Sequence, residues 1–207
     1  LACGNFPIVH TLRDYYLLCV RGTRYRRDRR CEGRCADCRL LTLSRTTAAR
    51  APAAVIGVSD HIVDAHKRAG VFLDTPAWVV CNSPEPPEVP HRVVRSLSRF
   101  GFLGRFEKAK GLPVIFDALA LLSESDLELR VAGAGRPDQL AYAQFRADAD
   151  GRIRLLGRQS PSAFFSTIDA LLVPTQWDEP FGRVAAEARG VNVPVIASDV
   201  GGLREPL

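Results

Sequence analysis

The chain has 207 residues, of which 46% are hydrophobic and 25% are charged, and its formal net charge is +5. These values are typical of a globular protein of one or two domains, and they exclude an intrinsically disordered chain. The sequence has no uninterrupted apolar run near the roughly 20 residues that cross a bilayer, and its N-terminal residues lack the pattern of a signal peptide. We therefore expect a cytoplasmic protein.

The two ends of the sequence suggest an incomplete fold. The chain contains no methionine and enters the strand-like run "PIVHT" almost at once. It stops soon after the glycine turn "DVGG", where another helix should begin. We therefore expect a fragment of a longer protein.

Much of the positive charge falls in one segment, residues 20–35, which we call the arginine-rich segment. It contains seven arginines, opposed only by Asp28 and Glu32. Such a segment can contact phosphates or the inner face of an anionic membrane, but a solvated loop is the commoner outcome. We therefore predict no nucleic-acid binding and leave peripheral membrane contact open.

Strand-like and helix-like runs alternate in the first part of the chain. Strands are expected at 7–11, 53–59 and 77–82. A helix is expected over 59–70, with Ser59 as its N-cap. The proline-rich stretch at 84–97 follows, and because proline lacks an amide donor, this stretch predicts a linker.

The alternation becomes regular from residue 98 onward. Five strands are expected, at 100–104, 127–135, 152–157, 169–175 and 193–199. Helices are expected between them, at 111–124, 137–148, 160–168 and 181–190. Strands that alternate with helices in this way predict a doubly wound α/β domain with a parallel sheet.

Small and basic residues follow the first two strands of this predicted sheet. Ligands of doubly wound sheets bind beyond the carboxyl ends of the strands. Gly104 allows a close backbone turn there, and Arg105 and Lys110 add two cations. Gly133 lies at the corresponding place, near the end of the second strand. This combination favours a diphosphate ligand over a carboxylate.

Backbone donors are expected near the last predicted helix. Phe181 and Gly182 lie where this helix begins, and Gly201 and Gly202 form a turn after the last strand. The N–H groups of a helix start and of a glycine turn make a concave surface suited to an anion. They are therefore expected to face the same ligand.

Two glutamates flank the start of the same helix. Carboxylates are good acceptors for vicinal hydroxyl groups, which a sugar nucleotide carries on both sides of its diphosphate. Glu187 is suited to a ribose and Glu179 to a transferred sugar. Taken alone, a glutamate among alanines is usually a surface residue or a helix former, so the hypothesis depends on the combination of these residues in chain order.

Five segments, the last of them "PVIASDVGGLRE", together resemble glycosyltransferase family four, the retaining nucleotide-sugar transferases of the two-domain GT-B fold. "FLGRFEKAKGLPVIFDAL" resembles the family's G-R-x-x-x-x-K-G segment, and "LRVAGAG" resembles its glycine turn. "RIRLLGRQS" resembles its nucleobase-side strand, and "EPFGRVAAEA" its paired-glutamate motif. The resemblance covers nearly the whole chain and is strongest from Phe102 to Glu205.

The resemblance implies an α/β chain of the GT-B type with two Rossmann-like parts. Residues 1–83 would be the later part of the acceptor-side domain, 84–97 the linker, and 98–207 the donor-binding domain without its last elements. Arg105 and Lys110 would contact the donor diphosphate and, with Glu179, form the catalytic set. The donor-binding residues implied are Gly104, Arg105, Lys110, Gly133, Glu179, Phe181, Gly182 and Glu187.

The resemblance also implies a reaction. A hexosyl group would pass from a nucleotide-diphosphate sugar to a hydroxyl of a saccharide or lipid-linked glycan, with retention of configuration, in cell-surface glycan or polysaccharide synthesis. It implies no required cofactor and no catalytic metal. The alternative is a non-catalytic module that binds nucleotide sugars or polyanions.

One motif departs from the family. In "HTLRDYY", Arg13 stands where the family has a histidine beside the reacting sugar. An arginine cannot act as a general base because it stays protonated, but it could hold the leaving phosphate or an acidic acceptor. We expect His10 to have a structural role.

The cysteines raise a further alternative. Four cysteines are close in sequence: Cys19, Cys31, Cys35 and Cys38. They could bind a structural zinc ion, remain reduced thiols or form a disulfide. Only Cys35 and Cys38 have the C-x2-C spacing typical of zinc sites.

Overall fold

The computed structural model describes residues 6–49, 52–82, 97–123 and 126–207. Its contacts divide the chain into two compact units. Unit 1 comprises Leu1–Asn82, Trp177–Gly182 and Val200–Glu205, and unit 2 comprises Ser83–Gln176, Arg183–Asp199 and Pro206–Leu207. Two short segments of the predicted second domain are thus grouped with unit 1. Of the predicted linker at 84–97, only Leu97 lies among the described residues.

Unit 1 contains a parallel sheet with the strand order β1-β4-β5. Its strands are β1 (Val9–Leu12), β4 (Ala54–Gly57) and β5 (Ala77–Val79). Helix α3 (Asp60–Arg68) follows β4, and the hydroxyl of Ser59 accepts a hydrogen bond from the backbone N–H of Ile62 at 3.1 Å. All three strands, the helix and its N-cap are as the sequence predicts.

The arginine-rich segment is more structured than a solvated loop. It forms a hairpin of β2 (Tyr25–Arg26) and β3 (Arg29–Arg30), with Arg27 and Asp28 at φ 52° and 59° in the turn. Two positive φ values are typical of the tight turns that join antiparallel strands. Helices α1 (Ala36–Leu41) and α2 (Leu43–Ala48) follow the segment.

Unit 2 contains a five-stranded parallel sheet with the order β10-β9-β6-β7-β8. The strands are β6 (Arg99–Arg105), β7 (Glu128–Ala134), β8 (Ile153–Gly157), β9 (Ala170–Val173) and β10 (Val195–Ala197). The chain proceeds from β6 to β7 and β8 on one side and then crosses to β9 and β10 on the other. The order therefore reverses between β6 and β9, which is where such sheets bind ligands.

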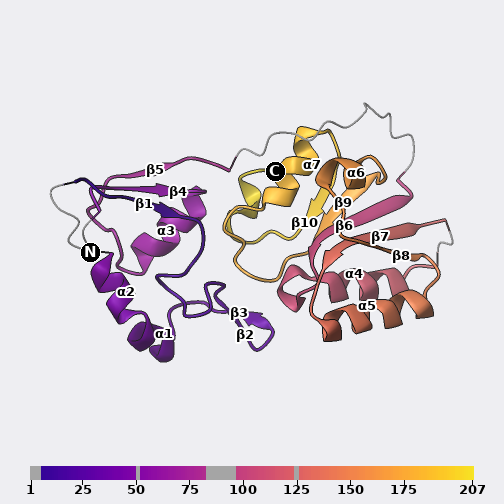
Figure 1. The fold of residues 1–207 in the computed structure, drawn as a ribbon, viewed down its shortest axis with the longest axis horizontal. Helices are drawn as coiled ribbons and strands as arrows, with labels where there is room; N and C mark the ends of the chain where they lie inside the picture. Colours follow the sequence, from indigo (N-terminus) through magenta and orange to yellow (C-terminus); the bar gives the residue numbers. More distant parts are fainter. Residues whose placement is uncertain (1–5, 50–51, 83–96, 124–125) are drawn as a thin grey trace. The chain divides into compact units, whose positions relative to one another are not determined.

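The helices of unit 2 cover both faces of this sheet. They are α4 (Leu112–Ala120), α5 (Pro137–Ala149), α6 (Pro161–Phe165) and α7 (Arg183–Gly190). Figure 1 shows α4 and α5 on one face and α6 and α7 on the other. The predicted doubly wound arrangement is confirmed, although α7 begins at Arg183 rather than at Phe181. No helix of the described part is long and apolar enough to cross a bilayer.

The core of unit 2 lies between the sheet and α4. Phe102 and Val131 from the central strands pack with Leu112 and Phe116 of the helix, and all four side chains are buried. Burial of large apolar side chains is the main favourable term in folding, at roughly 1.5–3 kcal/mol each. This packing fixes the carboxyl end of β6 relative to the start of α4.

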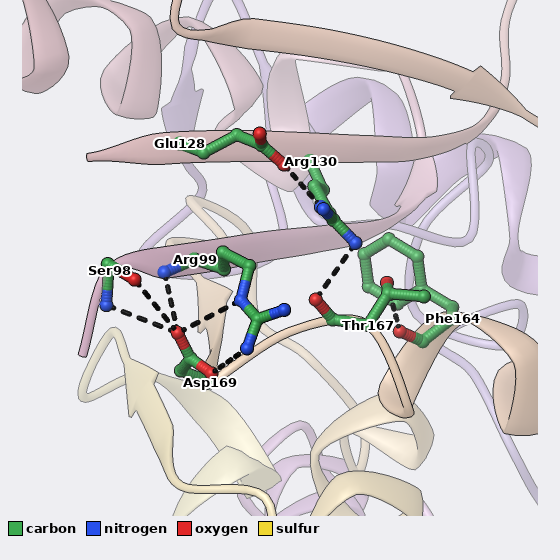
Figure 2. A network of polar contacts seen from close by, with 7 residues as sticks. All are labelled: Ser98, Arg99, Glu128, Arg130, Phe164, Thr167 and Asp169. Carbon is green, nitrogen blue, oxygen red and sulfur yellow. Dashed lines mark hydrogen bonds and ion pairs between the residues drawn. The ribbon is translucent and has the colours of Figure 1, made fainter. Parts of the chain in front are cut away.

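A polar network joins the amino ends of the strands, at the edge opposite the predicted ligand site (Figure 2). Asp169, immediately before β9, is 1% exposed and accepts hydrogen bonds from the backbone N–H groups of Ser98 and Arg99. The Arg99 guanidinium also pairs with this carboxylate at 3.1 Å. The network fixes the start of β9 against the start of β6.

Candidate functional site

The carboxyl ends of β6 and β7 bring three of the predicted site residues side by side. In the sheet register, Gly104 is opposite Gly133 and Arg105 is opposite Ala134. Gly133 has φ 146°, and a Cβ there would lie 1.8 Å from the Gly104 carbonyl oxygen. Only glycine fits this close backbone approach. Arg105 therefore lies at the end of β6 next to a pair of strand positions that carry no side chain.

Lys110 lies at the end of a 3-10 turn, η1 (Lys108–Lys110), which is attached to the loop after β9. The carbonyl oxygen of Ala109 accepts hydrogen bonds from Gln176 N at 2.8 Å and Thr175 Oγ1 at 3.1 Å. Gly111 has φ 79°, and a Cβ there would lie 1.9 Å from the Pro174 carbonyl oxygen. These contacts hold Lys110 at the point where the strand order reverses.

Arg105 has a partner that the sequence analysis did not identify. Its Nη1 lies 2.7 Å from Oε1 of Glu107, and the two side chains are 62% and 37% exposed. The Arg105 guanidinium has five N–H donors, so this ion pair orients it and leaves donors for a second anion. The acidic residue two positions after Arg105 is the signal that could have revealed the pair.

Glu187 is a buried residue, although glutamates in alanine-rich helices are usually exposed. It lies in α7 and is 6% exposed. Arg183 Nε donates to Oε1 of Glu187 at 2.7 Å from one turn earlier. Charged residues four positions apart on a helix are neighbours, so the spacing could have predicted this pair. Burial of a carboxylate is costly unless it is hydrogen-bonded, and the Arg183 guanidinium supplies such a bond.

Glu179 belongs to the segment Trp177–Gly182, which is grouped with unit 1. Trp177 Nε1 donates to Oε2 of Glu179 at 2.8 Å, and the indole is 8% exposed. The Ser59 hydroxyl donates to the carbonyl oxygen of Pro180 at 2.5 Å. The N-cap residue of α3 therefore also fixes the backbone beside Glu179.

The glycine turn at Gly201 and Gly202 supports this backbone. Gly202 N donates to the carbonyl oxygen of Glu179 at 2.7 Å. A Cβ at Gly201 would lie 2.5 Å from that same oxygen, and one at Gly202 would lie 2.3 Å from the Pro180 oxygen. We expected both glycines to offer donors to an anion. That expectation fails for Gly202, because its N–H is bonded within the protein.

Phe181 and Gly182 lie just before α7. Phe181 is 5% exposed, and Gly182 has φ 91°. This φ strains residues that have a side chain, and a Cβ at Gly182 would also lie 2.2 Å from Leu203 Cδ1, so substitution there is unfavourable. The two residues are part of unit 1 together with Glu179, whereas Gly104, Arg105, Lys110, Gly133 and Glu187 belong to unit 2.

The motif "HTLRDYY" contributes one packing residue and one exposed cation. The imidazole of His10 packs on the ring of Phe72 at 5.5 Å, and burial lowers the pKa of His10. This environment agrees with the expected structural role. Arg13 is exposed and follows the carboxyl end of β1.

The cysteines give the zinc alternative no support. Cys19, Cys31, Cys35 and Cys38 are free thiols. Within the described ranges, no three metal-ligating side chains form a group that could hold an ion. Hydrogen bonding from Cys38 lowers the pKa of Cys35, whereas burial raises the pKa of Cys38.

Unit 2 also has an apolar cavity of about 400 Å³. Its walls include Val114 and Leu119 of α4, Leu172 of β9 and Ile196 of β10. Apolar walls of this kind do not stabilise a diphosphate, because a charge moved away from water needs paired donors or cations. The polar strand ends remain the candidate for the anion.

Comparison with known proteins decides the family. The family described as "Glycosyl transferases group 1" matches residues 96–207. The chain belongs to this family. It is 28% identical over 198 residues to an uncharacterised 42.6 kDa protein in the cps region of Klebsiella pneumoniae, covering 96% of the chain and 52% of that relative. The chain thus spans about half the length of this relative.

Further similarities come from a second relative and from solved structures. The D-inositol 3-phosphate glycosyltransferase of Corynebacterium glutamicum is 36% identical over 114 residues, which is 49% of this chain and 27% of that protein. Among solved structures, Anabaena HepE in complex with UDP and glucose superposes with a TM-score of 0.75 at 21% identity, over 96% of this chain and 55% of HepE. This likeness confirms the predicted α/β fold of the GT-B type.

Proposed function

We propose that this protein transfers a sugar from a nucleotide-diphosphate sugar to an acceptor hydroxyl, with retention of configuration, in the synthesis of a cell-surface glycan or polysaccharide. The observation that carries the proposal is the carboxyl edge of the unit 2 sheet. There Arg105 emerges beside the glycine pair Gly104 and Gly133, and contacts with the loop after β9 hold Lys110 at the same edge. Two adjacent glycines that let a ligand approach the backbone, together with two cations, are suited to a diphosphate.

The cations have a role in the rate as well as in binding. Negative charge builds on the leaving diphosphate as the glycosidic bond breaks, so cations that are already in place stabilise the transition state more than the bound donor. The ion pair with Glu107 orients the Arg105 guanidinium before the donor arrives. This pre-organisation supports the assignment of Arg105 and Lys110 to the leaving group.

The glutamates are assigned to hydroxyl groups. The buried Glu187 carboxylate has one oxygen bonded to Arg183 and a second oxygen with which to accept from a ribose hydroxyl. Glu179, whose carboxylate accepts from the Trp177 indole, is assigned to the transferred sugar, and the backbone of Phe181 and Gly182 to the sugar or phosphate. We propose no cofactor and no catalytic metal.

The relatives support the donor class and the setting. HepE is solved with UDP and glucose and also with UDP-glucose, and WaaB is named as a lipopolysaccharide outer core galactosyltransferase. The Klebsiella relative belongs to a cps region. These names favour a hexosyl donor and a saccharide or lipid-linked acceptor. We further propose that the protein acts in the cytoplasm, at the inner face of the membrane.

Calorimetry with a panel of nucleotide sugars tests the proposal. Saturable binding of one donor that is lost in Lys110→Gln and Glu187→Gln supports it, while Arg154→Gln and Asp148→Asn, on exposed positions of β8 and α5, should bind normally. Binding of polyanions without any nucleotide sugar would instead support a non-catalytic binding module. An NMR spectrum of the product then reports whether the anomeric configuration is retained.

A further inference from the structure

Unit 1 contains a polar cavity that the proposed function does not yet use. Its volume is about 330 Å³. It is formed by the arginine-rich segment, α1 and the last turn of α3. Four guanidinium groups and one carboxylate line it, from Arg24, Arg34, Arg39, Arg68 and Glu32. So many arginines around one cavity indicate an anionic ligand.

Two of these arginines already have carboxylate partners. Arg24 Nη1 lies 3.0 Å from Oδ2 of Asp178, and its Nη2 donates to the Cys31 carbonyl oxygen at 3.2 Å. These contacts make Arg24 a fixed wall of the cavity. Arg68 lies 3.9 Å from Asp64 at the end of α3, where a cation also stabilises the helix dipole. The remaining binding capacity must therefore come from Arg34 and Arg39.

Arg34 has a donor without a partner. Its Nη2 donates to the hydroxyl of Thr42 at 2.6 Å, and that hydroxyl donates to the Cys38 carbonyl oxygen at 2.6 Å. The Nε of Arg34 is buried and has no hydrogen-bond partner in the described part of the chain. Buried polar groups are nearly always hydrogen-bonded, because an unpaired donor costs about 1–3 kcal/mol. A small movement of the Arg34 side chain, which lines the cavity, would bring this donor to an anion bound there.

Arg39 is the second arginine available to a ligand. It lies in α1 and is exposed, and among residues that the structure describes no carboxylate pairs with it. A guanidinium group presents parallel N–H donors that match two oxygens of a phosphate or carboxylate. Several guanidinium groups from different elements match an anion with three or four oxygens better than a carboxylate with two.

We propose that this cavity binds a phosphate-type oxyanion carried by the acceptor substrate, with Arg34 and Arg39 as its main ligands. The inference rests on the proposed function, since only a transferase has an acceptor. The cavity is larger than a phosphate, and Glu32 lines it as an acceptor for hydroxyl groups. A sugar phosphate or a lipid-linked sugar phosphate provides both the oxyanion and the hydroxyls.

The test measures binding in a protein whose donor site has lost its cations. In an Arg105→Gln/Lys110→Gln background, binding at the proposed diphosphate site no longer contributes. Calorimetry with pyrophosphate and with galactose 1-phosphate tests soluble oxyanions, and co-sedimentation with phosphatidylcholine vesicles, with and without phosphatidic acid, tests a lipid-borne phosphate. We expect Arg34→Gln/Arg39→Gln to weaken binding by roughly tenfold or more for each arginine.

A control variant with the same loss of charge distinguishes a specific binding site from non-specific electrostatic attraction. Arg27→Gln/Arg29→Gln removes the same charge from exposed positions of the arginine-rich segment that do not line the cavity. Three outcomes would overturn the proposal. Both double variants could weaken oxyanion binding equally, the Arg34→Gln/Arg39→Gln variant could bind as well as its parent, or no probe could bind at all. Should the double variant unfold by circular dichroism, Arg39→Gln alone, on an exposed position, replaces it.

The outcomes also separate this inference from the proposed function. Loss confined to the soluble probes indicates a sugar phosphate, and loss confined to the phosphatidic acid vesicles indicates a lipid-borne phosphate; either supports the site. If the unmodified protein binds no nucleotide sugar but keeps arginine-dependent oxyanion binding, the site is supported and the proposed function is refuted instead. If nucleotide sugars bind and the oxyanions do not, only the present inference falls.

Discussion

Arg183, the first residue of α7, donates from its Nε to Oε1 of Glu187 at 2.7 Å. The two side chains differ in environment, with 71% of Arg183 and 8% of Glu187 exposed to solvent. The exposed member can move with little cost, because surface ion pairs contribute only about 0–1 kcal/mol. The pair therefore orients a buried carboxylate through one of its two oxygens.

Substitution of Glu187 should impair donor binding more than folding. Glu187→Gln keeps the shape of the side chain but loses a charge-assisted hydrogen bond to the ribose, which corresponds to roughly 1.5–3 kcal/mol, or 10- to 100-fold weaker binding. Arg183→Gln should weaken binding by less than about tenfold, because the carboxylate remains. Calorimetric titration with the nucleotide sugar measures both. Equal affinity in Glu187→Gln and the unmodified protein would remove the ribose assignment.

Neutralisation of the two cations should reduce the rate of transfer. We expect Arg105→Gln and Lys110→Gln each to lower kcat/KM. Each loss should correspond to about 2–4 kcal/mol of transition-state stabilisation, by analogy with the loss of one oxyanion donor. Glu107→Gln leaves the Arg105 charge in place and should have a much smaller effect. Steady-state kinetics on the protein and its three variants provide the comparison. The assignment does not survive if both neutralised variants retain full activity.

Gly133 should tolerate no side chain. A Cβ at this position would lie 1.8 Å from the Gly104 carbonyl oxygen at φ 146°, so Gly133→Ala must shift the ends of β6 and β7. Strain and overpacking of this kind cost roughly 2–4 kcal/mol in the free energy of unfolding. Gly151→Ala is the matched control, because a Cβ there meets nothing within 4 Å. Urea denaturation should show a clear loss for the first variant and a change within about 0.5 kcal/mol for the second.

The polar network around Asp169 in unit 2 should be important for the stability of the fold and not for binding of the nucleotide sugar. Asp169→Ala leaves the backbone N–H groups of Ser98 and Arg99 without their acceptor, and we expect a loss of about 3 kcal/mol in the free energy of unfolding. Asp148→Ala, on the exposed face of α5, is the control and should change stability little. Nucleotide-sugar affinity measured well below the melting temperature should match the unmodified protein in both variants.

The same carboxylate predicts a contribution to acid sensitivity. Burial by itself raises the pKa of Asp169, but hydrogen bonds from the backbone of Arg99 and Ser98 and the Arg99 charge outweigh it, so its pKa is lowered. A lowered carboxyl pKa stabilises the fold above the unfolded value of about 4, and this stability is lost as the pH falls through the folded value. Asp169→Asn should therefore show a shallower loss of stability below about pH 4.

The sheet and its polar edge could be predicted from the sequence because the relevant signals are local. Parallel strands that are buried on both faces give short apolar runs, and glycines or charges follow them at the carboxyl ends. Strand β6, which contains Phe102 and ends with Gly104 and Arg105, illustrates both signals. The burial of Glu187 could not be predicted in this way, because it depends on which face of α7 meets the sheet.

Other features depend on contacts between distant parts of the chain. Gly201 and Gly202 have the composition of an anion-binding turn, but the structure uses them to hold the backbone of Glu179 and Pro180. The β2–β3 hairpin has no alternation of apolar residues, since three of its four strand residues are arginines. Arg24 and Arg34, on either side of this hairpin, line a cavity only because residues of α1 and α3 complete its walls.

His66 should make the stability of unit 1 depend on pH in a mildly acidic range. Its imidazole is fully buried, its Nδ1 donates to the Ile62 carbonyl oxygen at 2.8 Å, and burial lowers its pKa to about 4. Between the unfolded value of about 6.5 and the folded value, only the unfolded chain takes up a proton. Stability should therefore decline by up to roughly 3 kcal/mol from pH 6.5 to pH 4.

His66→Gln removes this titration and tests the origin of the decline. The variant should be less stable at neutral pH, because the ring packs beside Tyr15 at 6.3 Å, but its stability should vary less between pH 6.5 and pH 4. Burial also lowers the pKa values of His10 and His61, so part of the decline should remain. His10→Gln is the comparison variant. Urea titrations across this pH range should show that it reduces the pH dependence of stability less than His66→Gln does. An unchanged slope in His66→Gln would assign the decline to other groups.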